Sequence, residues 1–396
     1  MAIVKFVEVC EKIGSGATPR GGKEAYSDEG ISLVRSQNVL DFSFSSDGLV
    51  HINDEQAKKL KNVELHPDDV LLNITGDSVA RACIMDSSFL PARVNQHVAI
   101  VRGKKELVLN SYILYYLQWK KDYLLQLASA GATRNALTKG MIEQLDINLP
   151  SLTEQKRIVA VLDSIQQKIS VNKKINDNLE QQAQSYFQEL FVDNADPEWA
   201  IGTISDLGTV VGGSTPSKAK PEYYTESGIA WITPKDLSIN KSKFVSHGEN
   251  DITELGLKNS SAAIMPEGTV LFSSRAPIGY IAIAAGEVTT NQGFKSVVPK
   301  PEIGTPFVYF FLKNTLPVIE GMASGSTFKE VSGSTMKNVP AVIPDAETLA
   351  KFSDFCAPIF AQQRILEEQN QSLATLRDNL LPKLMSGEID VSAVQL

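Results

Sequence analysis

Apolar residues recur every three or four positions between Thr153 and Asp193, and this spacing predicts one long helix. The repeat averages three and a half residues, so one stripe of side chains follows the helix along its length. The stretch contains no proline or glycine. About forty residues at roughly 1.5 Å each give a rod on the order of 60 Å long. The stripe consists of Ile158, Leu162, Ile165, Ile169, Asn172, Asn176, Leu179, Ala183, Tyr186 and Leu190.

A second stripe of the same kind occurs 194 positions later and aligns with the first without a gap. A lone helix cannot bury such a stripe, so we expect the two helices to pack together. Asn176 aligns with Asn370, and a buried pair of asparagines there is one hypothesis for fixing the register. Exposure of both side chains to solvent is the alternative. The second stripe consists of Phe352, Cys356, Ile359, Gln363, Leu366, Asn370, Leu373, Arg377, Leu380 and Leu384.

The regions that precede the two helices also repeat, which makes the chain one unit written twice. A Gly-x-Thr-Pro turn stands at Gly16 and again at Gly213, each followed by a tyrosine and a Gly-Ile strand start. A proline turn then feeds an apolar strand, and a buried helix is expected over residues 112–117 and 307–312. We therefore predict α+β globular domains at 1–152 and 198–346, and long helices at 153–193 and 347–390.

Composition narrows the function classes. The net charge of −8 argues against nucleic-acid binding over the whole surface, although it leaves room for a local basic face. The three cysteines lie far apart without a CxxC pair, and the four histidines have no ligand spacing, so we expect buried thiols in a reducing cytoplasm and no metal site. A signal peptide and an apolar run long enough to span a bilayer are both missing.

Motifs for catalysis are also missing from the sequence. There is no P-loop, no GxSxG elbow, and no Asn/Asp-Pro-Pro-aromatic motif of an amino-methyltransferase. Asp68 and Asp69 occupy a turn, with Glu267-Gly268 in the equivalent place, which favours turn chemistry over metal binding. We therefore expect no catalysis and no cofactor in this chain.

Polar loops carry the candidate ligand-reading groups. Arginine suits guanine edges and asparagine or glutamine suits adenine edges, whereas lysine and threonine more often hold phosphates. For any single position a solvated charge or a turn residue is an equally good interpretation, so the prediction concerns the set. In the first domain the set is Thr18, Arg20, Arg35, Gln37, Asn38, Thr75, Arg81, Arg93, Asn95, Gln96, Thr133, Arg134 and Asn135. In the second domain it is Thr215, Lys218, Lys220, Thr233, Lys235, Arg275, Tyr280, Asn291, Gln292, Thr327 and Lys329.

The chain resembles the specificity subunits of type I restriction–modification enzymes over essentially its whole length, including the duplication. The resemblance rests on the Gly-x-Thr-Pro turns, the Pro-x-x-Val-Leu strands and the Leu-Pro-x-Leu-Thr-Glu-Gln-Lys-Arg-Ile run from Leu149 to Ile158. The second copy departs from this pattern, because Pro344 to Phe352 replaces the Glu-Gln-Lys-Arg helix start. Docking of one partner copy could therefore differ.

The resemblance implies two similar globular target-recognition domains joined by two long antiparallel coiled-coil helices around a pseudo-twofold axis. Each domain would read one half of a bipartite target in double-stranded DNA, and the helices would set the gap. It implies two methyltransferase (modification) subunits as partners, which would supply the S-adenosylmethionine chemistry, and it allows restriction (endonuclease) subunits. A rod on the order of 60 Å can hold two heads one to two DNA turns apart, at about 34 Å per turn.

Two other classes of function compete with this interpretation. The chain could be a self-sufficient methyltransferase or nuclease, against which the missing motifs argue. It could also be a coiled-coil scaffold with two protein-binding domains, against which the loop Arg, Asn and Gln groups argue mildly. Sequence-specific retention on DNA, with and without a methyltransferase partner, separates the scaffold from the specificity subunit.

Overall fold

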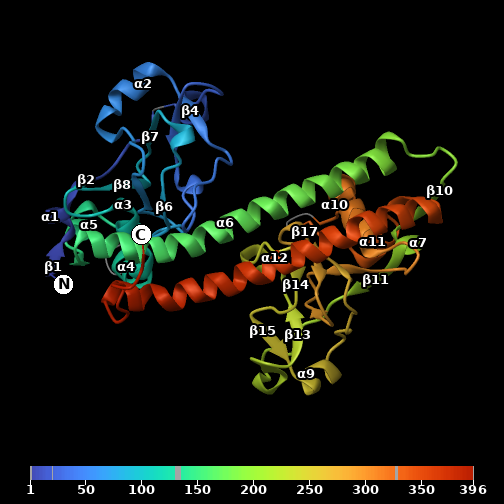
Figure 1. Ribbon diagram of the computed structural model, residues 1–396. Coiled ribbons are helices and arrows are strands. Elements are labelled where there is room, and N and C mark those ends of the chain that lie inside the picture. The colour runs from blue at the N-terminus through green and yellow to red at the C-terminus, as the bar shows by residue number, and fades with distance from the viewer. Residues whose placement is uncertain (1, 20, 130–134, 326–328, 396) are drawn as a thin grey trace. The chain divides into compact units, whose positions relative to one another are not determined.

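The computed structural model describes residues 2–19, 21–129, 135–325 and 329–395 (Figure 1). The chain forms two compact units, and both long helices are divided between them. Unit 1 comprises Met1–Ile169 with Ser372–Leu396, and unit 2 comprises Ser170–Gln371. Helix α6 (Leu152–Gln188) and helix α12 (Ala346–Ser386) each contribute one part to unit 1 and one part to unit 2. Each unit therefore holds one globular α+β domain and a section of both helices.

Unit 1 contains two packed sheets and a two-stranded ribbon. The larger sheet has the antiparallel order β2-β8-β5-β6, the smaller has the order β4-β3-β7, and the ribbon pairs β1 with β9. The strands are β1 (Ala2–Lys5), β2 (Cys10–Ser15), β3 (Ile31–Val34), β4 (Val50–Ile52), β5 (Val70–Asn73), β6 (Ala82–Ile84), β7 (Ala92–Val94), β8 (Val98–Gly103) and β9 (Asp146–Leu149). The helices besides the long pair are α1 (Phe6–Val9), α2 (Asp54–Lys59), α3 (Asn110–Trp119), α4 (Lys121–Ser129) and α5 (Lys139–Glu143).

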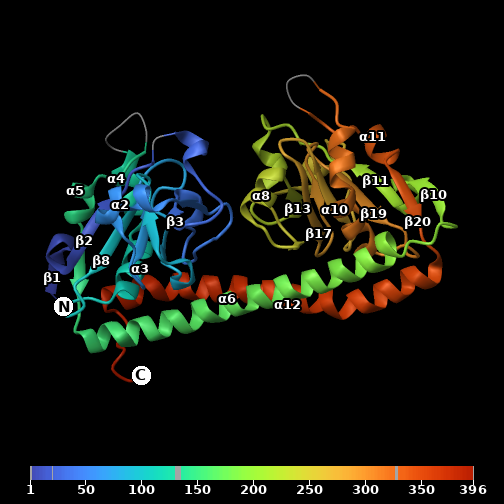
Figure 2. The same ribbon diagram turned by 90° about the horizontal axis from the view of Figure 1, so that it is seen from above.

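Unit 2 repeats this topology and adds short edge strands. Its sheets have the orders β11-β19-β16-β17-β14 and β12-β15-β13-β18, and its ribbon pairs β10 with β20 (Figure 2). The strands are β10 (Ala200–Thr203), β11 (Gly208–Gly212), β12 (Tyr224–Thr225), β13 (Ile229–Ile232), β14 (Phe244–Val245), β15 (Asn250–Ile252), β16 (Val270–Ser274), β17 (Ile278–Ala284), β18 (Thr289–Thr290), β19 (Lys295–Pro299) and β20 (Pro340–Ile343). The helices are α7 (Ile204–Leu207), α8 (Pro234–Ile239), α9 (Glu254–Lys258), α10 (Thr305–Gly321) and α11 (Gly333–Lys337).

The central strands β5 and β16 explain why each domain has two cores. Side chains alternate across a strand, so successive residues enter opposite faces of the sheet. In β5, Val70 and Leu72 join the core that contains α3 and the long helices, whereas Leu71 joins the core between the two sheets. In β16, Val270 and Phe272 make the same division from Leu271. A strand buried on both faces holds the sheets and helices together as one domain.

Both long helices begin at a side-chain cap, which explains where they start. The Ser151 N–H donates to Glu154 Oε2 at 2.9 Å, and the Glu154 N–H donates back to Ser151 Oγ at 3.3 Å. At α12 the carboxylate of Asp345 accepts from the Thr348 N–H at 2.9 Å. Gln155 is fully buried and accepts the Leu109 N–H at 2.9 Å, so the Glu-Gln-Lys-Arg run ties α6 to the start of α3.

The predicted stripes are buried or half-buried, but the opposite helix is only part of what covers them. Ile158 and Leu162 lie in one core with Leu381, Leu384 and Tyr112 of α3. In unit 2, Ala183 and Phe352 lie in one core with residues of α10. A third helix therefore shares the burial in each unit. The sequence stripe missed Phe187, which is 2% exposed and contacts the rings of Phe307, Phe310 and Phe352.

The hypothesis of an Asn176–Asn370 pair is wrong. The two helices run antiparallel in unit 2. A residue of α6 therefore lies opposite its counterpart in α12, 194 positions later, only near residue 174. Asn176 Nδ2 donates to the Gln363 carbonyl at 3.3 Å, and Asn172 Nδ2 donates to Gln369 Oε1 at 3.4 Å. Among the residues that the structure describes, the buried Oδ1 atoms of Asn172, Asn176 and Asn370 have no hydrogen-bond partner. The contact between the two helices, which we call the seam, is therefore polar at its midpoint, and some of its buried polar atoms lack a hydrogen bond.

The cysteines occupy apolar surroundings, as the sequence predicts. Cys10, Cys83 and Cys356 are free and buried. Burial raises the pKa of each thiol to about 12. A thiol with such a pKa stays protonated and unreactive at neutral pH.

Candidate nucleic-acid interface

The Gly-x-Thr-Pro turn brings the first candidate residues of unit 1 together. A Cβ on Gly16 would lie 1.8 Å from the Val94 carbonyl oxygen, so only glycine lets the turn pass this close to the chain before Asn95. The Thr18 hydroxyl then donates to Gln96 Oε1. The adjacent His97 Nδ1 lies 2.6 Å from the Thr75 hydroxyl. Loops that are far apart in the sequence therefore meet in one polar cluster.

Asn135 lies beside this cluster. Its carbonyl accepts the Gly76 N–H at 3.2 Å, and the neighbouring Leu137 N–H donates to the Ile74 carbonyl at 2.8 Å. The Asn135 side chain is exposed. One edge of the domain is thus formed by Thr18, Thr75, Gln96 and Asn135. We call this edge, and its counterpart in unit 2, the reading edge.

Unit 2 repeats the arrangement. A Cβ on Gly213 would lie 2.0 Å from the Asn291 carbonyl oxygen, and the Thr215 hydroxyl donates to Gln292 Oε1. Arg275 joins this edge because the Ser274 N–H donates to the Gly293 carbonyl at 2.7 Å. The same threonine–glutamine pair therefore stands at the same place in two domains whose other loops differ.

In unit 2 one carboxylate lies close to two cationic side chains of the reading edge. Glu330 lies 3.6 Å from Arg275 Nη1 and 3.7 Å from Lys295 Nζ. Arg275 and Glu330 are each more than a third exposed, so this contact is weak in water. A phosphate or a base edge that approaches Arg275 would compete with Glu330. Because the ion pair with Glu330 is weak, the arginine can leave it to bind such a ligand.

Several candidates of unit 1 have structural partners. Asn38 is fully buried, and its Nδ2 donates to the Ser45 carbonyl at 3.0 Å. Arg35 and Gln37 both donate to the Gly48 carbonyl, at 2.6 and 3.2 Å. These three residues therefore brace residues 45–48, and their contact with DNA remains a prediction.

Arg93 is 7% exposed and lies 3.3 Å from the Glu64 carboxylate. Its Nη1 also donates to the Ala92 carbonyl at 2.9 Å. Packing and this ion pair account for its presence in β7. A guanidinium held in this way is a poor candidate for reading a base.

Two candidate positions in each repeat form an Asn-Gln pair, Asn95-Gln96 and Asn291-Gln292. The asparagines of these pairs and Thr233 have capping roles. Asn95 Oδ1 accepts the His97 N–H at 2.9 Å, and Asn291 Oδ1 accepts the Gly293 N–H at 2.8 Å. Both asparagines thus close a bend, in agreement with the alternative that a candidate position is a turn residue. The Thr233 hydroxyl accepts the Asp236 N–H at the start of α8.

The remaining candidates are distributed over the surface of their units. Lys235 pairs with Glu249 at 2.6 Å, Lys220 lies 3.7 Å from Glu222, and the Tyr280 ring lies 4.4 Å from Lys241 Nζ. Lys218 and Lys329 are exposed, and Arg81 is half-buried. Arg20, Thr133, Arg134 and Thr327 lie outside the described residues.

Sequence reasoning left out three groups at these edges: His97, Lys295 and Glu330. His97 directly follows the Asn-Gln pair and bridges Gln96 to Thr75. Lys295 lies two residues after the equivalent bend in unit 2. Reading the residues just after each Asn-Gln pair would have found both, whereas Glu330 lies far away in the sequence and gave no signal.

The strongest electrostatic feature of unit 2 lies at the base of its domain, against the long helices. Glu180 of α6 lies 2.8 Å from Lys243 Nζ and 2.5 Å from Lys313 Nζ. Burial alone would raise the pKa of the Glu180 carboxyl, but the two lysines outweigh burial and hold that pKa at about 2. Burial lowers the pKa of Lys243 to about 8, against the opposing effect of Glu180. Both groups are therefore ionised at neutral pH.

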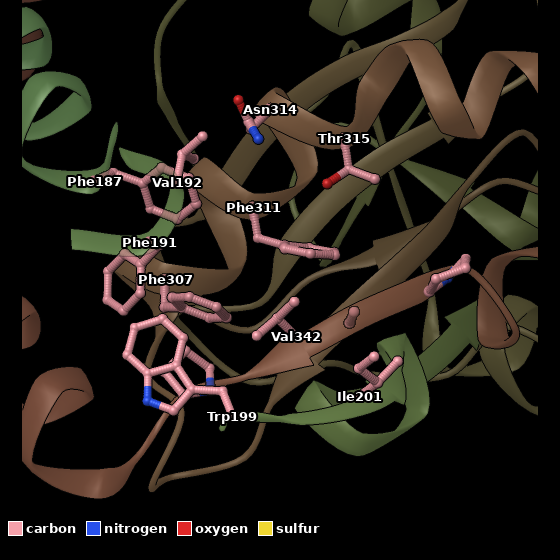
Figure 3. Close-up of a pocket in the computed structure, with 13 residues that line it drawn as sticks. Phe187, Phe191, Val192, Trp199, Ile201, Phe307, Phe311, Asn314, Thr315 and Val342 are labelled. Carbon is pink, nitrogen blue, oxygen red and sulfur yellow. The ribbon is translucent and has the colours of Figure 1, made fainter. Parts of the chain in front are cut away.

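An apolar groove of about 400 Å³ lies elsewhere in unit 2, between the end of α6, α10 and the β10–β20 ribbon (Figure 3). Phe187, Phe307, Phe311 and Trp199 line it, together with Asn314. On α3, the helix of unit 1 that is equivalent to α10, the corresponding positions carry larger side chains. There the hydroxyls of Tyr112 and Tyr116 donate to carbonyls of β9, and Trp119 stands where unit 2 has Asn314. The groove is thus a local difference between the repeats.

Over the described ranges, no cluster of three or more potential metal-ligating side chains occurs. The same part of the chain contains no helix with the length and apolarity to cross a membrane.

Comparison with known proteins gives a consistent result. The model of the type I restriction modification DNA specificity domain matches residues 1–181 and again residues 197–376. A type I restriction enzyme specificity subunit of Methanocaldococcus jannaschii is 39% identical over 191 residues, which span 46% of this chain and 44% of that relative. Another from Haemophilus influenzae is 22% identical over 439 residues, covering 91% of this chain and 94% of the relative.

Among solved structures, the S subunit of a type I restriction-modification system from M. genitalium has the same fold. It superposes with a TM-score of 0.58 at 15% identity, covering 97% of this chain and 96% of that chain.

Proposed function

Because the chain belongs to the type I restriction modification DNA specificity family and carries its domain twice, we propose that each copy reads one half of a bipartite target in double-stranded DNA. The chain supplies specificity and leaves catalysis to other subunits. The observation that carries this proposal is the repeated reading edge. Both domains place a threonine–glutamine pair and further polar loops at the same end of the same topology.

The reading edges contain the side chains that DNA recognition needs. Asn135 in unit 1 offers an amide suited to adenine, and Arg275 in unit 2 offers a guanidinium suited to guanine. The threonine–glutamine pairs are common to both domains, so they suit what any half-site shares, which is the phosphate backbone. The differing loops then carry the specificity.

The long helices supply the gap between the half-sites in this proposal. Both α6 and α12 continue without a break from one unit into the other. The number of helical residues between the domains therefore fixes a length that DNA has to match. Insertion of one heptad in each helix should lengthen the accepted gap, and an unchanged gap would contradict this role.

Two methyltransferase subunits are the proposed partners of the helices, and S-adenosylmethionine belongs to them. Val171 and Ile175 of α6 lie one turn apart and are 49% and 38% exposed, and Ile365 of α12 is 47% exposed. Exposed aliphatic residues on a helix favour a protein partner. Val171→Glu should lower the number of methyltransferase subunits bound, which native mass spectrometry of the complex measures.

One experiment tests the whole assignment. The chain is co-expressed with the methyltransferase of the same system, and methylated positions are mapped across the genome of the host cell. The proposal expects one motif with two specified halves and an unspecified gap of fixed length. Methylation without sequence preference, or a contiguous motif, would exclude it. Retention of a protein partner without any DNA preference would favour the scaffold function instead.

A further inference from the structure

In each unit one connection reaches from the recognition domain to the long helices and places a cation over an aromatic ring. In unit 1 this connection joins β3 to β4, and its Phe42 ring lies 4.0 Å from the Arg377 guanidinium of α12. In unit 2 it joins β13 to β15, and its Lys243 Nζ lies 3.4 Å from the ring of Phe360 of α12. The contact is the same, but the loop and the helix have exchanged the roles of cation and ring. We call these contacts the unit 1 seat and the unit 2 seat.

The unit 2 seat is deeply buried and directional. Lys243 is 7% exposed, and its ammonium group donates to Glu180 Oε2 at 2.8 Å and to Gln363 Oε1 at 2.9 Å. The backbone N–H groups of Lys243 and Phe244 donate to the two oxygens of Glu367 at 2.8 and 3.0 Å. One loop is therefore held by α6 and α12 at once.

The backbone joins this seat to the reading edge of the domain. The Ile283 N–H of β17 donates to the Lys243 carbonyl at 2.7 Å, and β17 pairs with β16. Strand β16 ends at Ser274, immediately before Arg275. A rigid strand thus runs between the seat and the candidate reader.

The unit 1 seat holds its loop in a strained conformation. Phe42 has a φ of 62°, a left-handed backbone that costs energy for a bulky residue. Its N–H donates to the Ala82 carbonyl of β6 at 2.9 Å, while Arg377 is fixed by Gln166 Oε1 at 2.8 Å. The neighbouring Asp41 pairs with Lys121 at 2.5 Å. The loop keeps this conformation because Phe42 is held on one side by β6 and on the other by Arg377 of α12.

A buried ion pair is an inefficient way to stabilise a fold. Taking both ions out of water costs free energy that their attraction repays only in one good geometry, and apolar residues of similar size often serve stability better. Apolar contacts, however, allow neighbouring surfaces to slide, whereas charged hydrogen bonds have fixed directions. The chemistry at the unit 2 seat is suited to holding an orientation.

We propose that Lys243 and Phe42 are positioning residues that fix how each recognition domain is seated on the helices, and that the seats thereby restrict the gap lengths that the complex accepts. This inference rests on the proposed function. Lys243 acts through Glu180, Gln363 and Glu367 and does not touch DNA. Phe42 acts through Arg377.

The test uses the complete complex of this chain with its methyltransferase subunits. Methyl transfer from labelled S-adenosylmethionine is measured on DNA duplexes whose gap is the preferred length or differs by one or two base pairs. Lys243→Met removes the charge and keeps the length of the side chain. Lys243→Arg keeps the charge, and Lys258→Met at an exposed position of unit 2 is the matched control.

With Lys243→Met, we expect methylation at the wrong gap lengths to rise about tenfold relative to the preferred gap, which corresponds to about 1.4 kcal/mol of lost discrimination. Lys243→Arg should restore most of the discrimination, and Lys258→Met should leave it unchanged. Base preference within each half-site should not change in any of them. A gap profile that stays as narrow as that of the parent chain, with lower thermal stability alone, would overturn the inference.

Phe42→Leu provides a second route if Lys243→Met does not assemble. It removes the ring under Arg377 at a more accessible seat, and it should broaden the gap profile in the same way. An unchanged profile overturns the inference. Failure of the parent complex to methylate any bipartite target would instead contradict the proposed function, so the two failures are distinguishable.

Discussion

Glu180→Gln is the substitution that tests the electrostatics of unit 2 most directly. The glutamine has nearly the same shape as glutamate and can still accept from one lysine. It removes the negative charge that faces both Lys243 and Lys313, at 2.8 and 2.5 Å. We expect unit 2 to lose stability at neutral pH and to lose part of its sensitivity to acid.

The magnitude follows from the pKa of the carboxyl. Its value falls from 4.5 to about 2 on folding, which corresponds to about 3 kcal/mol. Because the folded pKa is depressed, this stability is fully present above pH 4.5 and is lost as the pH falls toward 2. The variant should therefore be less stable by about 3 kcal/mol at pH 7, and the difference should shrink between pH 4.5 and pH 2.

Urea unfolding followed by tryptophan fluorescence measures this difference. In a Trp119→Phe background the remaining tryptophans, Trp199 and Trp231, both lie in unit 2. Glu189→Gln, at an exposed position directly after the end of α6, is the control and should show the pH dependence of the parent. A stability difference between Glu180→Gln and the parent that stays constant from pH 7 to pH 3 would refute the reasoning.

Three further substitutions probe the seam and the reading edge. Asn172→Leu should raise the free energy of unfolding by about 2 kcal/mol, because it replaces a buried amide whose Oδ1 has no partner among the described residues; urea titration measures it, and a loss of stability would contradict it. Arg275→Ala should relax the sequence preference at one half-site by about tenfold; equal losses at both halves in methylation mapping would indicate misfolding. Thr215→Val should weaken DNA retention about threefold for every sequence, because it removes one neutral hydrogen bond to Gln292; a change of sequence preference would instead make the pair a base reader.

The repeat and the helices could be predicted from the sequence because each depends on a regular pattern. The stripe from Ile158 to Leu190 follows one period, and its burial needed no knowledge of distant contacts. What shares that burial could not be predicted in the same way. Phe187 falls outside the stripe and is buried by Phe307 and Phe310, which approach it only after unit 2 has folded.

The candidate interface could also be predicted only in part, because residues in local turn motifs were found whereas burial by distant residues was not. Thr18 and Gln96 stand in recognisable turn motifs, and the structure brings them into contact. Arg93 looked equally suitable by residue type, but a guanidinium beside Glu64 is buried. Residue type alone does not distinguish a structural arginine from an exposed one. The seats gave no sequence signal either, because Phe42 and Lys243 differ in chemistry although they occupy the same connection.

The division of the helices has a consequence for how the molecule is made. Unit 2 is one continuous segment, so it can complete itself as soon as Gln371 has left the ribosome. The first segment of unit 1 precedes unit 2, yet the core of unit 1 includes Leu381, Leu384, Met385 and Val391, which follow unit 2 in the chain. The domain that is translated earliest is therefore the last to be closed. A chain that stops directly after Gln371 would have a finished second domain and an open first one, which a protease could recognise.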